Sequence, residues 1–130
     1  MSKTIQFNRV FQDGSDVLGE PVSVEAGKLT KVSEAVAAEE TDMPLSFASD
    51  VSELKHLYIL ADFDCLIETN DSAAPDETIT IKEGIPLEWD AESGYFDNPL
   101  GAVDVTVLYV TTAAGESGTL EIRALEDPTP

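Results

Sequence analysis

The sequence predicts an all-β protein, folded as a single β-sandwich or jelly-roll-like domain with at most one short helical turn. Apolar residues recur mostly at every second position, which is the period of a sheet with one buried face. The runs are short and are bounded by Gly, Pro, Asp or Asn, as in sandwiches and barrels. At 130 residues, 42% of them apolar, the chain has the size of one domain with its own core.

The first half of the chain predicts four strands and one helical turn. Short alternating runs predict strands at Thr4–Phe11, Val22–Glu25 and Pro44–Ala48. Residues 28–38 fit both a helical and a strand period, and we interpret them as a strand. Cap-type residues followed by a short amphipathic stretch predict one helical turn at Ser49–Lys55.

The middle of the chain predicts four more strands. Three of them are short: Leu57–Leu60, Thr78–Lys82 and Pro86–Trp89. The fourth, Asp62–Thr69, alternates most clearly, because Phe63, Cys65 and Ile67 share one face while the acids mostly take the other.

The last thirty residues predict a C-terminal hairpin. Val103–Thr111 is rich in β-branched residues, Thr119–Leu125 alternates in the same way, and 113–118 contains two glycines typical of a turn. The prolines of 126–130 cannot continue a ladder, so this segment is a short tail. The predicted core contains Phe63, Ile67, Val105, Val107 and Ile122. No repeat or long linker divides residues 1–130, which predicts one domain.

The charge excludes several classes of function. There are 26 acidic and 7 basic residues, which leaves a net charge of −19. The basic residues are scattered from Lys3 to Arg123 and form no patch for phosphates or anionic lipids, so we expect neither nucleic-acid nor membrane binding. No apolar run at the amino terminus resembles a signal peptide, and we expect the chain to be made and folded in a cytoplasm.

Catalytic and metal-binding motifs are scarce, and we expect no enzyme and no cofactor. The single cysteine, Cys65, and the single histidine, His56, exclude a disulfide within the chain and clustered imidazole ligands. His56 is interpreted as an exposed or edge histidine. Asp62 and Asp64 are interpreted as part of a solvated acidic face, with a calcium site as the alternative and a catalytic pair as the least favoured one. The acidic loop at 71–77 lacks the spacing of an EF-hand.

Two groups of residues are candidates for an interface. Trp89, Tyr95 and Phe96 fall in a turn-rich stretch, where aromatic rings can stack on sugars or anchor a protein contact. The favoured alternative is that Trp89 caps the sandwich and Phe96 plugs its end. Residues 1–12, with Ile5 and Phe7, are a candidate strand or arm that pairs with a neighbouring sheet edge, although pairing within the domain is favoured.

Several segments resemble small all-β structural proteins of tailed bacteriophages. These segments are Asp50–Lys55, Leu57–Asp62, Ile67–Asn70, Pro75–Ile79, Pro86–Trp89, Leu108–Thr111 and Leu120–Leu125. The resemblance implies a virion protein, most of all a capsid decoration (cement) protein on the capsid surface whose partner is the major capsid protein. It also implies a homo-oligomer, with trimers at local three-fold positions of the shell.

Two other functions stay open at this point. One is a minor tail or neck component of the virion. The other is a carbohydrate-binding β-sandwich that uses Trp89, Tyr95 and Phe96, with calcium held by Asp62 or Asp64.

Overall fold

The computed structural model describes residues 3–8, 11–19 and 21–127. Within these residues every regular element is a β-strand. In chain order the strands are β1 Lys3–Asn8, β2 Phe11–Asp13, β3 Asp16–Leu18, β4 Pro21–Ala26, β5 Lys28–Val36, β6 Met43–Leu45, β7 Leu54–Ala61, β8 Cys65–Thr69, β9 Thr78–Ile81, β10 Leu87–Asp90, β11 Leu108–Thr111 and β12 Gly118–Glu126.

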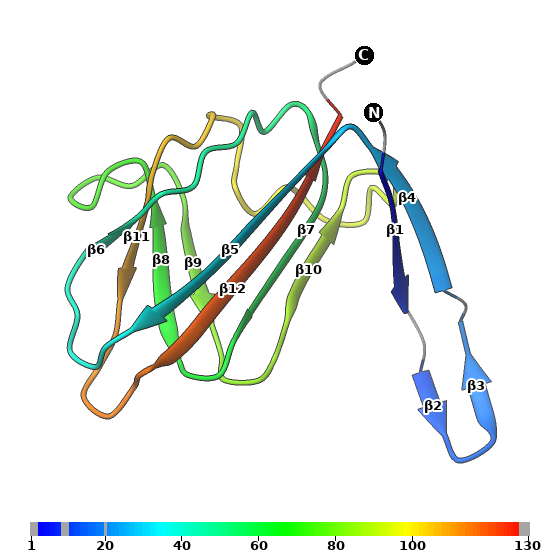
Figure 1. Ribbon diagram of the computed structural model, residues 1–130, viewed down its shortest axis with the longest axis horizontal. Helices are drawn as coiled ribbons and strands as arrows, with labels where there is room; N and C mark the ends of the chain where they lie inside the picture. Colours follow the sequence, from blue (N-terminus) through cyan, green and yellow to red (C-terminus); the bar gives the residue numbers. More distant parts are fainter. Residues whose placement is uncertain (1–2, 9–10, 20, 128–130) are drawn as a thin grey trace.

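Eight of the strands form two four-stranded antiparallel sheets that pack face to face as a β-sandwich (Figure 1). One sheet has the order β10-β7-β12-β5 and the other the order β6-β11-β8-β9. β5 pairs with β12 over its whole length, from Lys28 opposite Glu126 to Val36 opposite Gly118. The predicted all-β sandwich is therefore confirmed, and the ambiguous segment 28–38 is a strand.

The core lies between the inward faces of the two sheets. In β8 burial alternates strictly, so that Cys65 and Ile67 are buried while Leu66 and Glu68 are half-buried. The core includes apolar side chains with no solvent exposure: Leu57, Ile67, Val110, Leu120 and Ile122. Burial of one large aliphatic side chain stabilises the fold by about 1.5–3 kcal/mol.

One predicted core position is wrong. Val107 is half-buried, whereas its neighbours Leu108 and Val110 are buried. The alternation breaks because Val105 bridges to Ser49, after which the Asn70 side chain accepts the Thr106 N–H at 2.8 Å. The strand β11 then begins at Leu108 with the opposite phase. The other predicted core residues are buried: Phe63, Ile67, Val105 and Ile122.

The predicted C-terminal hairpin is also wrong. β11 pairs with β6 and β8, whereas β12 pairs with β5 and β7, so residues 112–117 cross from one sheet to the other. Both strands bury one face, and those two faces oppose each other only when the strands belong to different sheets.

The predicted helical turn at Ser49–Lys55 is a tight turn with two successive hydrogen bonds. Glu53 N donates to Asp50 O at 3.0 Å, and Leu54 N donates to Val51 O at 3.4 Å. The Asp50 carboxylate accepts from the Ser52 N–H at 3.1 Å and from the Ser52 hydroxyl at 2.6 Å, which lowers the pKa of Asp50. β7 follows directly, so the turn aims this strand into the sheet.

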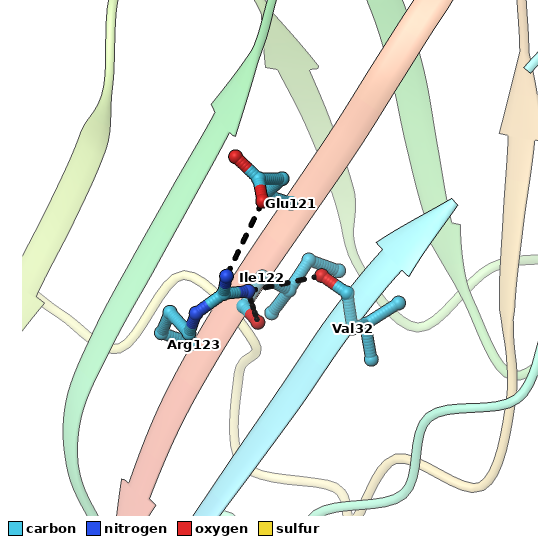
Figure 2. Close-up of polar contacts among 4 residues, drawn as sticks. All are labelled: Val32, Glu121, Ile122 and Arg123. Carbon is cyan, nitrogen blue, oxygen red and sulfur yellow. Dashed lines mark hydrogen bonds and ion pairs between the residues drawn. The ribbon is translucent and has the colours of Figure 1, made fainter. Parts of the chain in front are cut away.

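A charged side chain links the edge strand β5 to β12. Figure 2 shows the Arg123 guanidinium donating to the Val32 carbonyl at 3.2 Å and to the Ile122 carbonyl at 3.0 Å. Its second amino group donates to Glu121 Oε1 at 3.2 Å. Arg123 and Glu121 are two residues apart on one strand and so lie on the same outward face.

The four N-terminal strands form a separate hairpin that projects from the sandwich (Figure 1). β1 pairs with β4 and β2 with β3, and both pairs keep one continuous register from Lys3 opposite Ala26 to Asp13 opposite Asp16. Gly14, with φ 59°, opens the two-residue loop, as glycine does in hairpin turns. The predicted strands at Thr4–Phe11 and Val22–Glu25 thus pair with each other as β1 and β4, and residues 9 and 10 lie outside the described residues.

Candidate functional site

His56 lies inside the fold, and its interpretation as an exposed or edge histidine is wrong. Its side chain is 1% exposed, and Nε2 lies 3.4 Å from Glu88 Oε1. In the sheet His56 stands opposite Leu125 on β12 and Asp90 on β10. Leu125, opposite His56, is also buried. Strand β4 of the hairpin contacts β7, so the hairpin meets the sandwich at the strand that contains His56. The histidine and Glu88 thus link β7 to the edge strand β10.

Cys65 has the core position that its strand pattern predicts. Its thiol is buried, and burial raises its pKa to about 11. A thiol with that pKa stays protonated at neutral pH and is a poor nucleophile. A hollow of about 360 Å³ adjoins it, lined mainly by strand and loop residues such as Leu66, Ile81 and Thr112.

Asp62 and Asp64 hold two different loops. Asp62 Oδ1 accepts the Thr119 N–H at 2.8 Å, and Asp64 Oδ1 accepts the Glu83 N–H at 2.8 Å. Lys82 Nζ lies 3.8 Å from Asp64 Oδ2. Across the part of the chain that the structure describes, no group of three or more His, Cys, Asp or Glu side chains is placed to hold a metal ion. In the structure each of these two carboxylates accepts a hydrogen bond from a main-chain amide of another segment.

Asn70 connects two loops, a role that the sequence analysis missed. Its side-chain N–H₂ donates to Asp76 Oδ2 at 2.7 Å and to the Asp104 carbonyl at 2.9 Å. Its side-chain oxygen accepts the Thr106 N–H. Asn70 has φ 68°, in the left-handed region that asparagine tolerates better than most residues. An asparagine that ends a strand was the only local signal.

The candidate aromatic residues form a shallow surface depression. Tyr95 and Phe96 are 84% and 79% exposed, so Phe96 does not plug the end of the sandwich. Trp89 is half-buried and packs against the core, and its indole N–H donates to the Phe96 carbonyl at 2.9 Å. The depression has a volume of about 210 Å³ and is lined by Glu88, Trp89, Asp90, Ser93, Tyr95 and Phe96.

The candidate arm residues lie on one face of the hairpin. The register places Ile5 opposite Val24 and Phe7 opposite Val22, and residues directly opposite share a face. Continuing the alternation, this row of positions holds most of the apolar residues of the hairpin: Ile5, Phe7, Phe11, Leu18, Val22, Val24 and Ala26. The same row also includes Lys3 at its base and Asp13 and Asp16 at its tip. The other face is mostly polar: Thr4, Gln6, Asn8, Gln12, Ser23 and Glu25.

The tip of the hairpin is exposed. Residues 14–19 are all exposed, and Leu18 and Val17 expose 73% and 53% of their surface. The Gly14-Ser15 pair between two short runs is a known hairpin signal, so β2 and β3 were accessible to sequence reasoning.

Comparisons with protein-family models, with curated proteins and with solved structures find no match to this chain. Within the described residues no helix is long and apolar enough to cross a membrane.

Proposed function

We propose that this chain is a virion structural protein that binds the head shell of a tailed bacteriophage as a capsid decoration protein. The projecting N-terminal hairpin carries the proposal, because its described strands, β1 to β4, pair with neither sheet of the sandwich and project from it (Figure 1). The resemblance of residues 50–130 to small phage structural proteins supports the same reading.

The hairpin has the properties of a docking arm. A two-stranded ribbon is only marginally stable by itself in water, so a partner that covers its apolar face would stabilise it. Among the described residues β1 and β4 pair only with each other, so each has an outer edge at which a partner strand can add through main-chain hydrogen bonds. Ile5 and Phe7 belong to the face that such a partner would cover.

Binding of this kind stabilises a shell through linkage. A protein that binds the assembled lattice and not its broken form shifts the equilibrium toward the lattice. The proposed partner is the major capsid protein, and the proposed place of action is the capsid surface. Association of decorators into trimers would raise their effective concentration at neighbouring lattice sites.

The proposal is tested in two steps. Quantitative mass spectrometry of purified particles counts this chain against the major shell protein. A ratio near a simple fraction of the shell copy number is expected, a few copies per particle would indicate a tail or neck component, and absence from particles would refute a virion role.

The second step tests the hairpin with matched variants. Ile5→Asp with Phe7→Asp places two charges on the apolar face, and Thr4→Asp with Gln6→Asp places two charges on the polar face of the same strand. Co-sedimentation with undecorated shells should be lost in the first variant and retained in the second. Equal binding by both variants would remove the hairpin from the interface.

A further inference from the structure

The aromatic depression beside β10 lies in the longest stretch of the sequence without Lys or Arg. No Lys or Arg occurs between Lys82 and Arg123, while this stretch contains eight acidic residues. The depression itself is lined by Glu88 and Asp90, and among the residues that the structure describes no basic side chain lines it. Two more acids, Glu92 and Asp97, are exposed in the same loop.

Exposed rings stand within this acidic surrounding. Tyr95 and Phe96 offer two aromatic faces to solvent, at 84% and 79% exposure. The face of an aromatic ring carries partial negative charge and attracts a cation, and nearby carboxylates add to that attraction. Tyrosine and tryptophan are also the residues that most often anchor protein contacts, with arginine as a frequent partner.

The depression is held in place by the fold. The indole N–H of Trp89 donates to the Phe96 carbonyl, and Ala91 N donates to the Lys55 carbonyl on β7 at 3.0 Å. Asp90 Oδ1 also accepts the Glu92 N–H at 2.9 Å. A loop that is fixed before binding loses less conformational entropy when a partner docks.

We propose that this depression, formed by Trp89, Tyr95, Phe96 and the acids around them, binds an arginine- or lysine-bearing face of a partner protein. The charge of the surface favours this partner, because a guanidinium is attracted both by the aromatic faces and by the carboxylates. A neutral sugar has no such charge attraction. The surface is separate from the hairpin, so this inference and the proposed function can fail independently.

The single tryptophan of the chain lines the depression and reports binding by its fluorescence. The probe is a short arginine-rich peptide, compared with the same peptide in which citrulline, which has nearly the same shape and no charge, replaces arginine. We expect saturable quenching of Trp89 by the arginine peptide, loss of most of it at high salt, and binding by the citrulline peptide that is at least about tenfold weaker.

Paired variants separate the depression from the general negative charge. Tyr95→Ala with Phe96→Ala should weaken binding of the arginine peptide about five- to tenfold. Ile85→Ala, which removes another exposed apolar side chain outside the depression, should leave the affinity unchanged. Thermal melting confirms that each variant is folded.

Charge variants complete the test. Glu92→Gln with Asp97→Asn removes two acids beside the depression and should weaken binding of the arginine peptide several-fold. The control, Glu34→Gln with Glu39→Gln, removes two exposed acids on and after β5, at the opposite edge of the sheet, and should weaken binding less. Equal loss in both charge variants would mean non-specific attraction and would overturn the proposal. Unchanged affinity in the aromatic variant, or Trp89 quenching by neutral oligosaccharides but not by the peptide, would overturn it as well. The oligosaccharide result would favour a carbohydrate platform.

Discussion

The sandwich and the hairpin consist of the same secondary structure with the same alternation, yet they use it differently. In β8 and β12 the apolar face is buried against a second sheet of the same chain. In the hairpin the alternation also gathers most apolar residues on one face, but neither sheet of the sandwich includes these strands. The comparison teaches that a period of two marks an apolar face and does not say which molecule covers it.

Acidic residues are less frequent in the hairpin than in the rest of the chain. Only four of the 26 acidic residues lie in residues 1–26: Asp13, Asp16, Glu20 and Glu25. The other 22 lie in residues 27–130, and most of them are on the surface of the sandwich, with Glu126 buried. A strongly charged surface keeps a folded protein soluble. In the hairpin the register places Asp13 and Asp16 at the tip of the face that includes Ile5 and Phe7, so the apolar stretch suited to docking lies along β1 and β4.

The largest effect is expected from a charged substitution in the core of the sandwich. Val110→Asp places a carboxylate at a position with no solvent exposure and should destabilise the fold by several kcal/mol, enough to prevent cooperative melting. Val107→Asp, three residues earlier and half-buried, should melt much closer to the parent. Circular dichroism melts of both variants check the phase of β11, and the reverse order would contradict it.

A second pair compares packing in the two regions. Ile122→Ala removes a fully buried side chain from the core and should lower the free energy of unfolding by about 2–5 kcal/mol. Leu18→Ala, at the exposed tip of the hairpin, should change it by less than about 0.5 kcal/mol. Urea denaturation measures both. A large loss for Leu18→Ala would show that the hairpin tip packs on this chain in solution.

Two glycines with positive φ sharpen the comparison. Gly101 has φ 78°, and an added methyl group would lie 2.6 Å from Glu77 Oε1, so Gly101→Ala should cost about 1–3 kcal/mol. At Gly14, with φ 59°, an added methyl group meets no atom within 4 Å. The only expected cost of Gly14→Ala is therefore the backbone strain of a positive φ in the hairpin turn. This strain should speed amide exchange in the hairpin without changing the melting temperature of the sandwich. A drop in that melting temperature would link the two regions.

The smallest effect concerns crowded carboxylates of the body. Desolvation, and then the hydrogen bond with Asp42, raise the pKa of Glu68 above its ordinary value of 4.5. The folded state therefore binds this proton more tightly than the unfolded state, and its contribution to stability falls as pH rises through a window that begins at 4.5. Glu68→Gln should be slightly more stable than the parent at neutral pH and equal to it below that window. Melting curves across this pH range test the sign, with Glu34→Gln as the control for net charge.

The strand pattern was sufficient to predict the class of fold and most strands. Cys65, Ile67 and Ile122 are buried as the alternation of their strands predicts, and Phe63 is buried in the bend between β7 and β8. It failed at Val107, where residues far away in the sequence reset the phase: the Asn70 side-chain oxygen accepts the Thr106 N–H, and the Asn70 N–H donates to the Val107 carbonyl. It also missed the hairpin strands β2 and β3, whose Gly14-Ser15 turn was a readable signal.

The candidate surfaces were predicted only as residue types. The sequence left open whether Trp89, Tyr95 and Phe96 are exposed or belong to the core. In the structure Trp89 is half-buried, whereas Tyr95 and Phe96 are exposed. The burial of His56 had no local signal, because the residues that surround it come from β10 and β12.

The order of residues alone predicts the β class, the apolar and polar faces of most strands, and the lack of basic residues from 83 to 122. These are local properties, because alternation and charge depend only on residue order. Three features come from the tertiary structure: β11 and β12 belong to different sheets, strands β1 to β4 form a hairpin that projects from the sandwich, and Tyr95 and Phe96 face solvent. Those facts depend on which strands pair and which faces meet, and partners far apart in the chain leave no mark on the local pattern.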